Sequence, residues 1–141
     1  MKIKAIIFDL FGTLIDSFNA REYKKVLSEM ASSLSLPEDS FFDLWNSSFN
    51  QRALGTFKTL QESFEFISNQ LNMPLNPEGI DQAIKIRLDY SKKTLVPRND
   101  TLSTLEQLRI KGFKIGLISD CTYEIPSIWE RTMLAKYFDN V

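Results

Sequence analysis

The stretch AIIFDLFGTLID, residues 5–16, decides the fold. It opens with an apolar run at 5–8 and becomes polar at Asp9. A short apolar run, rich in β-branched residues and ending in a polar cluster, predicts a strand that is buried on both faces in a parallel sheet. The stretch FKIGLI, residues 113–118, repeats the pattern and ends at Ser119. We therefore expect two buried parallel strands, each followed by a turn into a helix.

Between these strands the apolar residues recur at helical spacing. The residues predict an α/β fold, with a parallel-sheet core at 1–16 and 95–141 and a helical insertion at 17–94. A third strand is expected to begin near Asp139. The expected helices run from Asp16 or Ser17 to about Leu34, from Pro37 through Phe49, from about Thr59 to Leu71, from Pro77 past Leu88, from about Asp100 to Lys111 and onward from Pro126.

The composition excludes several kinds of chemistry. The 141 residues include no His and one Cys, so no catalytic triad with histidine, no internal disulfide and no thiolate zinc cluster can form. Seventeen basic and eighteen acidic residues give a net charge of −1, so neither nucleic acid nor a membrane surface is expected as a partner. The first apolar run is too short for a signal peptide or a membrane span, and we expect a cytoplasmic protein.

The two strand ends carry the candidate chemistry. In a parallel sheet, ligands bind beyond the carboxyl ends of the strands, where Asp9 and Ser119 would meet if their strands are neighbours. Gly12 and Thr13 are expected to offer free backbone N–H groups to an anion. An aspartate beside an anion site can hold Mg²⁺ or attack phosphorus or carbon. These residues predict a hydrolase with a small-molecule substrate.

Residues 6–16, IIFDLFGTLID, resemble the first motif of the haloacid dehalogenase-like (HAD) hydrolases, and residues 116–120, GLISD, resemble the second. The resemblance covers about residues 1–16 and 95–141 and implies a Rossmann-like sheet core with a helical cap that closes over the site. It also implies roles for individual residues. Asp9 would be the nucleophile and a Mg²⁺ ligand; Phe11 would offer its backbone carbonyl to the metal; Ser119 would bind the phosphoryl or carboxylate group; and Gly12, Thr13 and the Asp120 amide would line the anion pocket.

Phe11 stands where the phosphatase branch of this family has an acidic residue that protonates the leaving group. Loss of general acid catalysis costs about 10²–10⁴-fold in rate. An aromatic residue here resembles the dehalogenase branch, whose halide leaving group needs no proton. The favoured expectation is a Mg²⁺-dependent phosphatase acting on a phosphate ester through an aspartyl-phosphate at Asp9, and the alternative is a metal-independent 2-haloacid dehalogenase.

The resemblance further implies a Lys and one or two acidic residues on strands beyond residue 141. Without those strands the apolar strand at 5–8 would be an open edge, which invites pairing with another chain. We therefore expect this 141-residue form to self-associate. A further alternative is a non-catalytic binding or oligomeric module that keeps the fold.

The remaining residues have structural interpretations. Trp45, Trp129 and the aromatic residues at 41, 42 and 49 are expected in the core. Cys121 is expected to be a small buried apolar residue. Arg21 and Arg52 are expected to face solvent, with contact to a substrate anion as the alternative for one of them.

Overall fold

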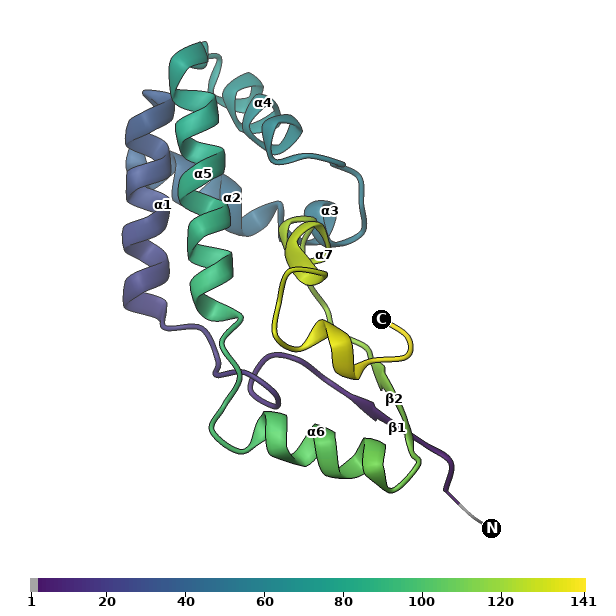
Figure 1. Cartoon of the computed structure of the whole chain (residues 1–141). Helices are drawn as coiled ribbons and strands as arrows, with labels where there is room; N and C mark the ends of the chain where they lie inside the picture. Colours follow the sequence, from purple (N-terminus) through teal and green to yellow (C-terminus); the bar gives the residue numbers. More distant parts are fainter. Residues whose placement is uncertain (1–2) are drawn as a thin grey trace. The chain divides into compact units, whose positions relative to one another are not determined.

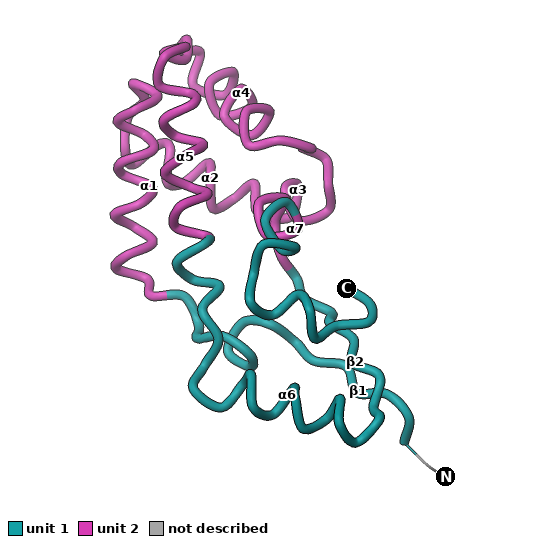
Figure 2. The backbone as a smooth tube through the Cα atoms, in the orientation of Figure 1, with its two compact units in different colours: residues 1–18, 92–120, 127–141 teal, residues 19–91, 121–126 magenta. Residues whose placement is uncertain are grey.

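The computed structural model describes residues 3–141, so Met1 and Lys2 lie outside the described residues. The chain forms two compact units (Figures 1 and 2). Of the described residues, the first comprises 3–18, 92–120 and 127–141, and the second, which is helical, comprises 19–91 and 121–126. Residues 121–126 thus group with the helices, whereas the expected boundaries assigned them to the sheet core.

The first unit is built on a pair of parallel strands, β1 (Ala5–Phe8) and β2 (Lys114–Leu117). Their register runs from Ala5 opposite Lys114 to Phe8 opposite Leu117. α6 (Thr101–Ile110) precedes β2, and Gly112, at a φ of 80° that favours glycine, turns the chain from helix into strand. The mixed α/β fold with a parallel sheet, predicted from the sequence, is confirmed.

The expected third strand is present as a single parallel bridge beside β2. Asn140 bridges Gly116, and the Leu117 amide donates to the Asn140 carbonyl at 3.0 Å. The Asp139 carboxylate accepts hydrogen bonds from the Ile115 amide at 2.9 Å and from Lys114 Nζ at 3.0 Å. The Ile115 hydrogen bond, followed by the contact with Lys114, lowers the pKa of Asp139.

The expectation that both strands are covered on both faces is wrong for β1. Ile7 is 64% exposed, while Ile115 of β2 is 1% exposed. Among residues 3–141, β2 is the one strand that pairs with β1, so the outer edge of β1 carries no partner. The core of the unit lies instead around the turn after β1, the inner face of α6 and the C-terminal segment: Leu10, Leu14, Ile15, Leu105, Ile115 and Leu134 are each at most 4% exposed.

That C-terminal segment includes the last part of α7 (Glu124–Trp129), whose first residues belong to the helical unit, and a short 3₁₀ helix at Ala135–Tyr137. Trp129 is 5% exposed and packs edge-on against Phe138 at 5.6 Å, as expected for a core residue. The last helix starts at Glu124, before the expected Pro126, and it is only 6 residues long.

The helical unit contains α1 (Ala20–Leu34), α2 (Glu38–Ser47), α3 (Phe49–Ala53), α4 (Leu60–Leu71) and most of α5 (Pro77–Thr94). Its core is aromatic: Phe41 and Trp45 from α2 and Phe64 from α4 are fully buried and lie 5.7–6.5 Å apart between ring centroids. Gly79 of α5 allows a close approach to α1, because a Cβ there would lie 1.7 Å from the Ser33 carbonyl oxygen.

Two expectations for this unit are wrong in detail. α1 is capped by Asn19, whose Oδ1 accepts from the amides of Arg21 and Glu22, and not by Asp16 or Ser17. The chain between Gly12 and Phe18 forms the turn after β1, which delays the start of the helix. Phe49 is 40% exposed and begins α3, because α2 already ends at Ser47.

Within residues 3–141, no helix combines the length and the apolar character that a membrane span requires.

Candidate active site

The parallel pairing brings Asp9 and Ser119 to the same edge of the sheet. Phe8 pairs with Leu117, and the Ile118 amide donates to the Phe8 carbonyl at 2.9 Å. Asp9 and Ser119 therefore each follow the last paired residues of neighbouring strands. Asp9 is exposed, so its carboxylate is open to a ligand from solvent.

Ser119 supplies an unsatisfied polar group at this edge. Its Oγ is buried and has no hydrogen-bond partner among the described residues. A buried hydroxyl without a partner costs about 1–3 kcal/mol, so such a group usually marks a place where a water or ligand binds. The neighbouring Asp120 side chain is exposed.

The expectation of free amides at Gly12 and Thr13 is wrong. The Gly12 amide donates to the Ile15 carbonyl at 2.9 Å, and the Thr13 amide donates to the Leu10 carbonyl at 3.3 Å. Both amides therefore donate to carbonyls within the turn and are not available to a ligand. Gly12 has a φ of 75°, a conformation that favours glycine. Across residues 3–141, by contrast, no backbone carbonyl accepts from the amides of Leu10, Phe11 or Asp120. In this turn the available backbone donors are therefore the amides of Leu10 and Phe11, which lie nearer to Asp9 in the sequence than the expected Gly12 and Thr13.

A cationic side chain, Arg98, also lies against this turn, although no sequence motif predicted it. The Arg98 amide donates to the Leu14 carbonyl at 3.0 Å, and Arg98 Nη1 lies 3.5 Å from the Gly12 carbonyl oxygen. Arg98 Nε is 3.9 Å from the Asp16 carboxylate, in a pair whose side chains are 47% and 89% exposed. Such an exposed pair contributes little to stability. At this position Arg98 provides a positive charge beside the turn.

The Phe11 side chain stacks on Phe18, with ring centroids 4.7 Å apart. It carries no proton that could be given to a leaving group. The expected Mg²⁺ site had two donors in this chain, the Asp9 carboxylate and the Phe11 carbonyl. No group of three or more acidic, Cys or His side chains that could hold a metal occurs in the described part of the chain. Mg²⁺ takes six oxygen ligands and in proteins is held by one or two carboxylates together with waters and substrate phosphate, so the Asp9 carboxylate and the Phe11 carbonyl would supply only part of its coordination.

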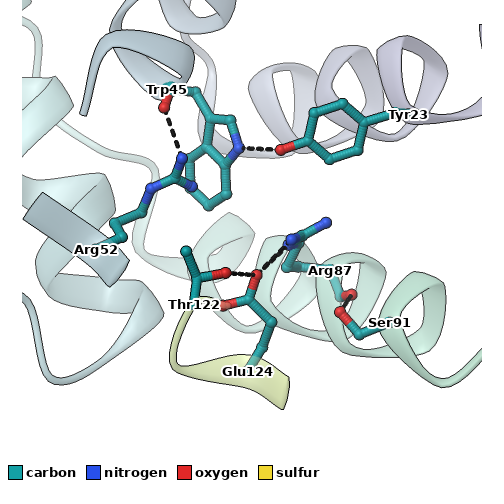
Figure 3. Close-up of polar contacts among 7 residues, drawn as sticks. All are labelled: Tyr23, Trp45, Arg52, Arg87, Ser91, Thr122 and Glu124. Atoms are coloured by element: carbon teal, nitrogen blue, oxygen red, sulfur yellow. Dashed lines mark hydrogen bonds and ion pairs between the residues drawn. The ribbon is translucent and has the colours of Figure 1, made fainter. Parts of the chain in front are cut away.

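The helical unit contains a second polar cluster that the sequence did not reveal (Figure 3). The Trp45 indole N–H donates to the Tyr23 hydroxyl at 2.7 Å. Arg52, expected to face solvent, is 4% exposed. Its guanidinium stacks on the Trp45 ring, with Cζ 3.7 Å from the ring centroid, and its Nη2 donates to the Trp45 carbonyl at 2.7 Å.

The other half of the cluster is a buried ion pair. Arg87 of α5 and Glu124 are 4% and 1% exposed. Arg87 donates to Glu124 Oε1 from Nε at 2.8 Å and also from Nη2, and Thr122 Oγ1 donates to the same oxygen at 2.6 Å. We name Arg87, Glu124 and Thr122 the carboxylate clamp.

The electrostatics of this region follow from its burial. Burial is the largest effect on Glu124 and raises its pKa, but the charge of Arg87 and the Thr122 hydrogen bond outweigh it, so the net pKa is lowered. Burial lowers the pKa of Arg52. Two buried arginines face one buried glutamate, and Arg52 Nε and Arg87 Nη1 have no partner among residues 3–141.

One sequence signal could have pointed to Arg87. It lies four residues after Ala83 and three before Tyr90, both buried, so it occupies the apolar face of its helix. A charged residue on such a face is rarely buried without a partner. Arg52 gave no comparable signal. Cys121, expected to be buried, has intermediate exposure.

Comparisons with known proteins identify the fold. No family model and no curated protein matches this chain. The HAD family enzyme bt-2542 from Bacteroides thetaiotaomicron aligns with a TM-score of 0.62 and 20% identity, over 99% of this chain and 68% of its own. The L-2-haloacid dehalogenase RSc1362 aligns with a TM-score of 0.52 and 19% identity, over all of this chain.

These neighbours identify the fold: the chain has the fold of the HAD enzymes, as the two sequence motifs predicted. It spans 63% of the length of the dehalogenase.

Proposed function

We propose that this protein is a hydrolase of an anionic substrate that acts through a covalent intermediate on Asp9. The observation that carries the proposal is the buried, unpartnered Ser119 hydroxyl, which follows the strand next to that of Asp9. The free amides of Leu10, Phe11 and Asp120 add donors for the same anionic group. The HAD fold supports this assignment.

For a phosphate ester, a carboxylate oxygen of Asp9 attacks phosphorus as the bond to the leaving oxygen breaks. Water then attacks the aspartyl-phosphate, which releases phosphate and restores the carboxylate. The Ser119 hydroxyl and the amide donors hold the phosphoryl oxygens in both steps. Because Phe11 cannot protonate the leaving oxygen, we expect a preference for esters with acidic leaving groups, such as aryl or acyl phosphates.

Phe11 also favours the second candidate, hydrolytic dehalogenation of a 2-haloacid. Here the Asp9 carboxylate attacks carbon, halide leaves without a proton, and water cleaves the resulting ester. Ser119 would then bind the carboxylate of the substrate. A non-catalytic module that keeps the fold is the remaining alternative.

Two assays, each run with and without Mg²⁺, separate these candidates: release of nitrophenol from para-nitrophenyl phosphate and release of chloride from 2-chloropropionate. The phosphatase proposal expects nitrophenol release that Mg²⁺ stimulates, and the dehalogenase proposal expects chloride release that is indifferent to Mg²⁺. Asp9→Asn should abolish either turnover, and Ser119→Ala should raise KM. If neither product forms, or if Asp9→Asn retains activity, the enzymatic proposal is wrong.

A further inference from the structure

The segment that follows Ser119 and Asp120 is held by the helical unit. Residues 121–126 pack with residues 19–91 (Figure 2). Thr122 and Ile125 are each 5% exposed and Glu124 is 1% exposed. A surface loop would expose such residues, so this burial shows that the segment is anchored.

The anchor is the carboxylate clamp (Figure 3). One oxygen of Glu124 accepts from two nitrogens of Arg87 and from the Thr122 hydroxyl. The two donors on Arg87 have fixed relative directions, so the pair defines one orientation of the glutamate and of the backbone that carries it.

The other end of the segment is fixed by the sheet. The Ile118 amide donates to the Phe8 carbonyl, and the preceding Leu117 amide donates to the Asn140 carbonyl. Residues 118–122 form neither helix nor strand. The Ser119 hydroxyl has no hydrogen-bond partner among the described residues, so no side-chain hydrogen bond holds Ser119 in place.

We propose that Glu124 is a positioning residue for the anion-binding group of Ser119 and Asp120. The carboxylate clamp holds the chain three to five residues after Ser119 and thereby restricts the conformations open to the backbone that carries the anion-binding groups. This inference rests on the proposed function, because it assigns the clamp a role in the same anion site.

The test uses the full chain and inorganic phosphate as the probe, titrated by calorimetry at a temperature where every variant is folded. Glu124→Gln removes the charge of the clamp, and we expect phosphate affinity to fall about tenfold. Thr122→Val keeps the ion pair and the side-chain volume while removing one hydrogen bond, so it serves where Glu124→Gln fails to fold. We expect it to weaken phosphate binding about threefold.

Glu29→Gln is the matched control, because it removes an exposed glutamate of the same unit that pairs with Lys25 at 3.8 Å. It should leave the phosphate affinity unchanged. A clamp with a purely structural role would lower Tm in Glu124→Gln and Thr122→Val without changing the phosphate affinity of the folded protein, and that result overturns the inference.

The control for the proposed function is the unmodified chain with its Ser119→Ala variant. If Ser119→Ala loses phosphate binding while the clamp variants bind phosphate as the unmodified chain does, the inference about Glu124 is wrong and the proposed anion site stands. Absence of phosphate binding to the unmodified chain overturns the anion site itself, and the inference falls with it.

Discussion

Replacing Glu124 by Gln should be among the most destabilising single changes in the helical unit. The carboxylate is 1% exposed and accepts three hydrogen bonds from Arg87 and Thr122. Gln keeps the shape but removes the charge, so it leaves the Arg87 guanidinium buried and uncompensated. Arg52 lies nearby, since both guanidinium carbons are within 6 Å of the Trp45 ring centroid: 3.7 Å for Arg52 and 5.8 Å for Arg87.

Removing one partner of a buried ion pair costs about 3–5 kcal/mol. A domain of this size is stable by about 5–15 kcal/mol, so the change removes a large part of the free energy of unfolding. At about 3 °C per kcal/mol, we expect Tm to fall by about 10–15 °C.

Urea denaturation followed by circular dichroism and by tryptophan fluorescence measures this loss. Glu29→Gln again provides the control, because the exposed Lys25–Glu29 pair should contribute less than about 0.5 kcal/mol. A loss below about 1 kcal/mol in Glu124→Gln, with an unchanged denaturant slope, would refute the view that the carboxylate is needed as a buried charge.

Three further predictions follow from other features. The free energy of unfolding should fall as the pH drops below 4.5, the ordinary pKa of Glu, because the pKa of Glu124 is lowered in the folded chain and its carboxylate therefore stabilises the fold above that pH. Denaturation curves of Glu124→Gln should lack this part of the acid dependence. Ile7 is 64% exposed on β1, whose outer edge is unpaired, so we expect it to promote self-association. Ile7→Lys should therefore lower the mean mass measured by light scattering. An unmodified chain that is monomeric at high concentration would contradict this prediction. Phe11→Asp should supply a general acid and raise turnover of alkyl phosphates by about 10²-fold, and an unchanged rate would argue against the phosphatase proposal.

The fold was predictable where local pattern decides structure. Both strands, the end of a helix at Gly112 and the helix expected from about Thr59 to Leu71 follow from apolar periodicity and from the preference for glycine after a helix. The last of these helices is α4, which begins at Leu60 directly after its N-cap Thr59. Burial of β1 was not predictable from its own residues. An apolar strand has the same sequence whether or not another element packs on its face, and Ile7 is 64% exposed on its face of the sheet.

The candidate site was predictable as a set of residue positions but not as a set of donors. Strand pairing placed Asp9 and Ser119 together, as the motifs indicated. Which amides can bind a ligand depends on the hydrogen bonds within the turn, and the amides of Gly12 and Thr13 already donate to carbonyls of that turn. The buried arginines were missed for other reasons. Arg87 pairs with Glu124, which lies 37 residues away and reaches it only in the packed structure. Arg52 lies near Trp45 in sequence, but the two residues are on different helices, and the break between α2 and α3 was not predicted.

Stability alone does not explain the carboxylate clamp. A buried ion pair replaced by apolar residues of similar volume is often neutral or even stabilising, because the desolvation of both charges is avoided. The double variant Arg87→Met with Glu124→Met should therefore recover most of the stability that Glu124→Gln loses. The double variant cannot recover the fixed orientation of residue 124, because methionine side chains pack in many orientations, whereas the guanidinium group of Arg87 binds the carboxylate in one. If the clamp positions Ser119, this double variant should unfold near the midpoint of the unmodified chain in urea and still bind phosphate several-fold more weakly. If it regains both properties, orientation by the ion pair is not what the chain requires at Glu124.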